Sequence, residues 1–211
     1  MADKSLVKIK KKYHHGDLRE QLLEAVRELV EKHGPDSFSI AEACRLAGVS
    51  TAAPYKHFKD RDDILRCVAL QAMGRLRDAM QAAADAYAAG DPRRIAALGQ
   101  AYVDFACSES GVFRMMFSLT EAHQNDPDLT DAGEKAKCLV ERLVAEHLGR
   151  DPDTPDVKLR AYALHCFVHG HSFLRIDAKT PDDMSAEAEA ALLRLVGDAM
   201  LPQHQRSGYT A

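Results

Sequence analysis

The feature that most constrains this chain is the stretch from Phe38 to Phe58, FSIAEACRLAGVSTAAPYKHF, in which two short helical patterns flank a glycine. Ser39 followed by Glu42 fits a capping box, in which two side chains satisfy free backbone N–H groups at the start of a helix. Gly48 stands where the first helix must end, because glycine adopts the left-handed conformation without a steric penalty. Two helices that meet at such a turn predict a helix-turn-helix.

The second helix of this pair is expected to be short, polar and cationic. Proline lacks an N–H and is tolerated only in the first turn of a helix, so Pro54 favours Thr51 over Ser50 as the N-cap of a helix about two turns long. Such a helix suits one that reads bases in the major groove of DNA. The motif offers these side chains for contact with DNA: Ser39, Ser50, Thr51, Ala52, Tyr55, Lys56, His57 and Lys59.

A plain helical hairpin inside a larger bundle is the alternative, because glycine turns between helices are common. The complete run GVSTAAPYKHFKDRDDIL, residues 48–65, decides between them, since it resembles the signature of the TetR family of bacterial transcription regulators. The resemblance covers about the first third of the chain. It implies an all-α protein with an N-terminal three-helix DNA-binding domain. The run departs from the family in having Ala52 and Ala53 and no arginine or glutamine, so base readout is expected to be sparse.

Composition places the chain in a reducing compartment. Its five cysteines are widely spaced, with no CxxC pair and no signal peptide, and no apolar stretch is long enough to cross a bilayer, so a cytoplasmic protein is expected. A net charge of −4 alone would argue against nucleic acid. The charge is uneven, however: residues 1–66 hold thirteen Lys and Arg against eleven Asp and Glu, while the remainder holds fifteen against twenty-one.

Residues 1–12 are predicted to form a flexible basic arm. They contain Lys10, Lys11 and Lys12 among five lysines, a single acidic residue, Asp3, and no apolar periodicity. We expect the arm to contact phosphates or the minor groove beside the helix-turn-helix. The alternative is a solvated leader that only aids solubility.

About nine helices are expected, because apolar residues recur at helical spacing along most of the chain. A long fourth helix that opens at Asp60 and Asp63 is expected to bridge two domains. The expected organisation is a basic arm (1–12), a helix-turn-helix domain (13–62), an all-α ligand-binding and dimerisation domain (63–202) and a flexible tail (203–211). The family resemblance implies a homodimer formed by the last two long helices.

A group of histidines lies in the helix predicted from Thr154-Pro155 to Ile176, where His165 and His169 have the i, i+4 spacing of metal ligands. No acidic partner completes a metal site, so packed histidines or a dimer seam are the favoured interpretation. The run FVHG at 167–170 resembles the Trp-x-His-Gly core of the WHG type of TetR C-terminal domain, with phenylalanine in place of tryptophan. The YHHGDLR string near the N-terminus resembles the start of many such proteins.

Methionines and aromatic residues with a few polar tips suit a flexible apolar ligand. The expected pocket residues are Tyr102, Phe105, Met115, Met116, Phe117, Tyr162, His165, Cys166 and His169. No catalytic motif is present, and no cofactor or metal is expected. The prediction is therefore a cytoplasmic homodimeric repressor that binds a palindromic double-stranded DNA operator and is released by a small apolar or amphipathic effector.

Two alternatives remain at this point: a constitutive dimeric DNA-binding protein without ligand sensing, and a helical metal-dependent enzyme that uses His165 and His169. Effector identity, operator sequence and the sign of regulation are not set by the sequence.

Overall fold

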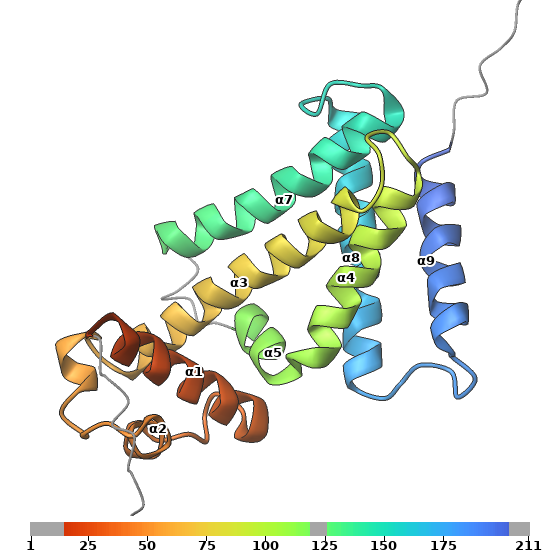
Figure 1. The fold of residues 1–211 in the computed structure, drawn as a ribbon. Helices are drawn as coiled ribbons and strands as arrows, with labels where there is room; N and C mark the ends of the chain where they lie inside the picture. The colour runs from red at the N-terminus through yellow and green to blue at the C-terminus, as the bar shows by residue number, and fades with distance from the viewer. Residues whose placement is uncertain (1–14, 119–125, 203–211) are drawn as a thin grey trace, which may run out of the picture. The chain divides into compact units, whose positions relative to one another are not determined.

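The computed structural model describes residues 15–118 and 126–202, and over these ranges the protein is all-α, as expected (Figure 1). No described helix is both long and apolar enough to cross a membrane. The described helices are α1 (His15–His33), α2 (Ile40–Ala47), the 3-10 turn η1 (Pro54–Lys56), α3 (Arg61–Asp85), α4 (Arg93–Ser108), α5 (Ser110–Ser118), α7 (Pro127–Leu148), α8 (Pro155–Ile176) and α9 (Ala186–Met200).

The chain divides into two compact units, residues 1–68 and 69–211. The division falls inside α3, which therefore begins in the first unit and continues into the second. The domain boundary expected after residue 62 lies in the same helix, nearer its start.

The first unit is built by α1 and α2 packing together, and the caps of α2 follow the sequence pattern. Ser39 is the N-cap, and its side-chain oxygen accepts a hydrogen bond from the Glu42 backbone N–H at 3.1 Å. Gly48 ends the helix with φ of 69°, in the left-handed region that glycine tolerates best. These two residues confirm the predicted start and end of the first helix of the motif.

The second helix of the motif is shorter than expected. It is the three-residue turn Pro54–Lys56, with Ala53 at the N-cap and no side-chain cap bond, so the expectation that Ser50 or Thr51 caps a helix of two turns is wrong. The chain already turns before the proline, because the Ala53 N–H donates to the Ser50 carbonyl at 3.0 Å in the tighter i, i+3 pattern. Pro54 then supplies no N–H to continue an α-helical ladder.

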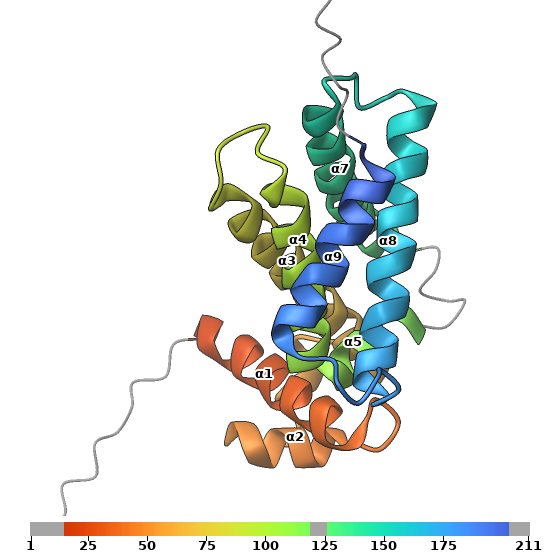
Figure 2. The same cartoon turned by 90° about the vertical axis from the view of Figure 1, so that its right-hand side faces the viewer.

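The second unit packs α4 against α8 and α9, and α7 against α8 (Figures 1 and 2). Their starts carry predictable caps: the Asp126 side chain accepts from the first backbone N–H groups of α7, and Ser185 accepts from the Ala188 N–H at 3.2 Å at the start of α9. These caps set where the two helices begin.

A buried polar cluster fastens α4, α8 and α9 to one another. Glu189 of α9 is only 4% exposed and lies 2.8 Å from His171 Nε2 and 3.1 Å from Arg175 Nε, both of α8. Gln100 of α4 donates to its second carboxylate oxygen at 3.2 Å. Burial raises the pKa of Glu189, but the hydrogen bonds from His171 and Gln100 and the charge of Arg175 outweigh it and hold the pKa below its ordinary value.

Candidate DNA-binding turn and ligand cavity

The turn after α2 presents the side chains that the sequence assigned to DNA. Each of the eight candidates in the described part of the chain is exposed: Ser39, Ser50, Thr51, Ala52, Tyr55, Lys56, His57 and Lys59. Tyr55 is 64% exposed, so its ring and hydroxyl are available for contact. Lys10, Lys11 and Lys12 lie outside the described residues.

The exposed turn is anchored from below by buried side chains. Phe58 is 4% exposed and closes the turn, and the Arg19 guanidinium of α1 lies 5.2 Å from the centre of its ring. The same guanidinium donates to the Cys67 sulfur at 3.3 Å, which ties α1 to α3. The orientation of Tyr55 and Lys56 is therefore set by contacts on the opposite side of the backbone.

The start of α3 is capped tightly next to this turn. The Asp63 N–H donates to the Asp60 side chain at 2.8 Å, and the Asp63 carboxylate accepts from the Lys59 N–H at 3.0 Å. The guanidinium of Arg61 lies 4.6 Å from the Phe38 ring centre and donates to the Pro35 carbonyl. The turn and the first residues of α3 thus form one rigid corner.

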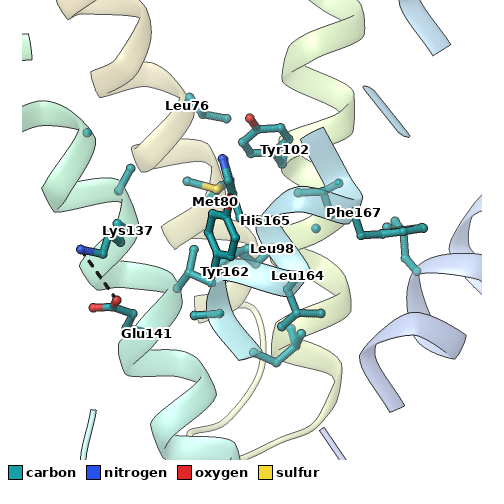
Figure 3. A pocket seen from close by; sticks show the side chains of 18 of the residues that line it. Leu76, Met80, Leu98, Tyr102, Lys137, Glu141, Tyr162, Leu164, His165 and Phe167 are labelled. Carbon is teal, nitrogen blue, oxygen red and sulfur yellow. Dashed lines mark ion pairs between the residues drawn. The ribbon is translucent and has the colours of Figure 1, made fainter. Parts of the chain in front are cut away.

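The second unit contains a cavity of about 540 Å³. This volume lies within the range of roughly 300–1,000 Å³ that holds drug-sized ligands. Helices α3, α4, α5, α7, α8 and α9 contribute to its wall. Its apolar wall includes Leu76, Met80 and Leu98 (Figure 3). Ile95, Val168 and Leu193 also belong to this wall.

Five of the nine expected pocket residues line this cavity, namely Tyr102, Met116, Phe117, Tyr162 and His165. The other four, Phe105, Met115, Cys166 and His169, do not. Phe105 and Met115 are buried in packing away from the cavity, and Cys166 is exposed. Helical spacing groups such residues but does not say which of two apolar faces borders an empty space.

The residues that sequence reasoning missed come mainly from α3 and α7. Met73, Leu76 and Met80 line the cavity from α3, and Lys137, Val140 and Glu141 line it from α7. One signal was available in the sequence of α7. The residues Ala132, Ala136 and Val140 repeat at four-residue spacing on one face of this helix, and Lys137 and Glu141 follow directly beside them.

The aromatic end of the cavity carries uncharged polar groups. The Tyr102 hydroxyl lies 2.9 Å from His169 Nδ1, and burial raises the pKa of Tyr102. The His165 and His169 rings stack with centres 5.4 Å apart. Burial lowers the pKa of both histidines, and the charge of His165 lowers that of His169 further, so both rings are neutral at pH 7. This end can hydrogen-bond a ligand but offers it no charge.

Two family models match this chain. Residues 22–68 match the model described as bacterial regulatory proteins, tetR family, and residues 95–199 match the tetracyclin repressor-like C-terminal domain. The chain belongs to the TetR family. A comparison with curated proteins gave no match.

Solved structures share the fold of this TetR-family protein over nearly its whole length. A protein of unknown function from Rhodococcus sp. RHA1 is 29% identical with a TM-score of 0.78, over 91% of this chain and 100% of that chain. PfmR from Thermus thermophilus is 20% identical with a TM-score of 0.60, over 88% and 99%. FadR from Bacillus subtilis, solved in complex with stearoyl-CoA, is 16% identical with a TM-score of 0.67, over 88% and 98%.

Membership of the TetR family makes the protein a DNA-binding transcription regulator with a helix-turn-helix. In the residues that the structure describes, no group of three or more His, Cys, Asp and Glu side chains is placed to hold a metal ion. The stacked pair His165 and His169 instead packs around Tyr102. The WHG subtype stays a prediction.

Proposed function

We propose that this TetR-family protein is a homodimeric repressor that binds a palindromic operator and is released from it by a small apolar or amphipathic effector. The observation that carries the proposal is the continuity of α3. Its first residues form the corner beside the DNA-binding turn, and Met73, Leu76 and Met80 of the same helix line the cavity. A ligand that displaces these three side chains therefore acts on a helix that belongs to both units.

The length of α3 makes it a suitable connection. Its 25 residues span about 38 Å at 1.5 Å per residue. An α-helix is stiff over this length, so a small rotation at the cavity end changes the position of the other end. In a dimer, the two DNA-binding turns must lie about 34–36 Å apart, or a multiple of this, to enter successive major grooves. A displacement of α3 alters that spacing.

Exposed apolar side chains on α8 and α9 support a dimer. Leu159 is 67% exposed and Leu195 is 66% exposed, and the two helices pack side by side (Figure 2). Large apolar side chains that cluster on a surface mark protein contacts. The variant Leu195→Arg is expected to shift the protein to a monomer in light scattering and to abolish operator binding, because one half-site supplies too few contacts.

A relative of the same fold supports a ligand-binding role for the cavity. FadR from Bacillus subtilis was solved in complex with stearoyl-CoA, so a fold of this kind holds a molecule with a long apolar chain. As a regulator of bacterial DNA, the protein would act in the cytoplasm.

A ligand screen by thermal shift, followed by titration of each hit with and without operator DNA, tests the sensing role. Linkage requires the operator to weaken ligand binding by the factor with which the ligand weakens operator binding, typically 5- to 150-fold. The variant Ala136→Phe, which fills the cavity from α7, should lose the ligand response but keep operator binding. A ligand that occupies the cavity and binds free and DNA-bound protein equally would favour the constitutive regulator instead.

A further inference from the structure

One carboxylate lines the cavity in a position that is unusual for an acid. Glu141 of α7 is only 8% exposed, although it borders a largely apolar space. Its ion-pair partner among the described residues is Lys137, whose ammonium lies 4.0 Å away, at the outer limit of such a contact. A buried carboxylate is costly unless it is closely paired and hydrogen-bonded. Glu141 therefore retains capacity to accept a positively charged group.

The two lysines that line the cavity are paired much more closely, and with other carboxylates. Lys137 Nζ lies 3.0 Å from Glu134, and Lys158 Nζ lies 2.9 Å from Asp153. An anionic ligand would compete with one of these carboxylates for its lysine. A cationic ligand would take Glu141 and leave Lys137 with Glu134, so no group would lose its partner.

Aromatic rings lie on the other side of this carboxylate. Tyr162 of α8 lines the cavity across from Lys137 and Glu141 of α7, as Figure 3 shows, and Tyr102 and Phe117 line it further along. The faces of such rings attract ammonium groups by about 0.5–2 kcal/mol. The combination of a buried carboxylate and aromatic rings is one that suits an organic cation.

We propose that the cavity binds a cationic amphiphile, a molecule with one amine or quaternary ammonium group and an apolar body. The ammonium group contacts Glu141 beside the Tyr162 ring, and the apolar body lies against Leu76, Met80 and Leu98. This ligand class rests on the proposed sensing function, since it names what the same cavity senses.

The test compares three probes of equal chain length, decylammonium, decanol and decanoate, by isothermal titration calorimetry below their micellar concentrations. The wild-type protein should bind the cation most tightly. In the variant Glu141→Gln, the ratio of the affinity for the cation to that for decanol should fall by roughly 10- to 100-fold, the usual value of a hydrogen-bonded charge. An unchanged ratio, or a preference for decanoate in the wild-type protein, would overturn the proposal.

Two further variants keep the test independent of any damage to the fold. Lys137→Met removes the competing ammonium and should tighten binding of the cation, a gain that a damaged protein could not show. Glu134→Gln leaves Lys137 with Glu141 alone and should weaken binding. Weaker binding of the cation by Lys137→Met together with tighter binding by Glu134→Gln would overturn the proposal.

The outcomes also separate the ligand class from the sensing role. If all three probes bind equally and each releases operator DNA, the charge preference fails while sensing stands. If the cation binds with the expected dependence on Glu141 but leaves operator affinity unchanged, the ligand class holds and the proposed regulation fails.

Discussion

Removing Glu189 should destabilise the second unit strongly, although this residue does not line the cavity. In Glu189→Leu, the His171 ring loses its partner at 2.8 Å and Gln100 loses its acceptor at 3.2 Å. A buried donor left without a partner costs about 1–3 kcal/mol. Arg175 is one-third exposed and can turn to water, so its loss adds less. The expected decrease in the free energy of unfolding is about 3 kcal/mol.

This free energy corresponds to a fall in Tm of about 6–12 °C, at 2–4 °C per kcal/mol for a protein of this size. Urea denaturation followed by circular dichroism measures it. The matched control is Glu187→Leu, an exposed glutamate in the first turn of α9, which should cost less than about 1 kcal/mol, because it removes only the contacts of this carboxylate at the start of the helix. The double variant Glu189→Leu/His171→Phe should regain part of the stability, because replacing both partners by apolar groups leaves neither of them as a buried polar atom.

The dependence on pH gives an independent check. The pKa of Glu189 is lowered in the folded protein, so the cluster stabilises the fold above the ordinary glutamate pKa of about 4.3, and this contribution is lost as pH falls through the lower folded value. The difference between wild-type and Glu189→Leu proteins should therefore shrink below about pH 4. A destabilisation at pH 7 under about 1 kcal/mol, or one equal to that of Glu187→Leu, would refute this account of the cluster.

Three further predictions concern DNA contact and pH. Lys56→Ala and Tyr55→Phe should weaken operator binding with little change in Tm, since both side chains are exposed; an unchanged footprint in Lys56→Ala would contradict the assignment. Deleting the arm through Lys12 should reduce the slope of log K against log salt by about 0.9 for each phosphate that the arm neutralises, whereas an unchanged slope would make the arm a solubility leader. Stability should fall as pH drops below about 6.5, because the pKa values of His165 and His169 are lowered in the folded protein and the unfolded chain binds protons first; replacing both by glutamine should flatten this dependence.

The sequence predicts most of the fold because the ends of the helices are set by local chemistry. Ser39, Gly48 and Ser185 form the caps that their residue types favour. The second helix of the motif was predicted too long for a related reason. Pro54 is compatible with the first turn of an α-helix and also with a 3-10 turn. Which of the two forms depends on how the buried side chain of Phe58 packs, and the helix propensities of the neighbouring residues carry no information about that packing.

The cavity is harder to predict than the helices, because it is a property of the space between several helices. Met115 and Met116 are adjacent in sequence and both buried, yet only Met116 borders the cavity. The α3 contribution, Leu76 and Met80, has the same apolar spacing as a core stripe. Glu141 is the one cavity residue that stands out from an ordinary core stripe, because it is a buried carboxylate beside small apolar residues. Burying a carboxylate costs free energy unless a charged or hydrogen-bonding partner compensates.

The buried charges decide which wall of the cavity can yield to a ligand. Helices α4, α8 and α9 are fastened by the Glu189 cluster, whose disruption costs about 3 kcal/mol because it leaves buried donors unpaired. The stretch of α3 that lines the cavity is made by Met73, Leu76 and Met80, and methionine side chains adapt readily. Beyond this stretch, buried Arg94 of α4 holds the end of α3, because its guanidinium donates to the Ala84 carbonyl at 3.2 Å and pairs with Asp85 at 3.1 Å. The ion pair of Arg75 with Glu109 at 2.5 Å, also on α3, is partly exposed and so worth about 1 kcal/mol. The proposed ligand would therefore displace the cavity stretch of α3, between the Arg94 contacts and the part of the helix that belongs to the DNA-binding unit.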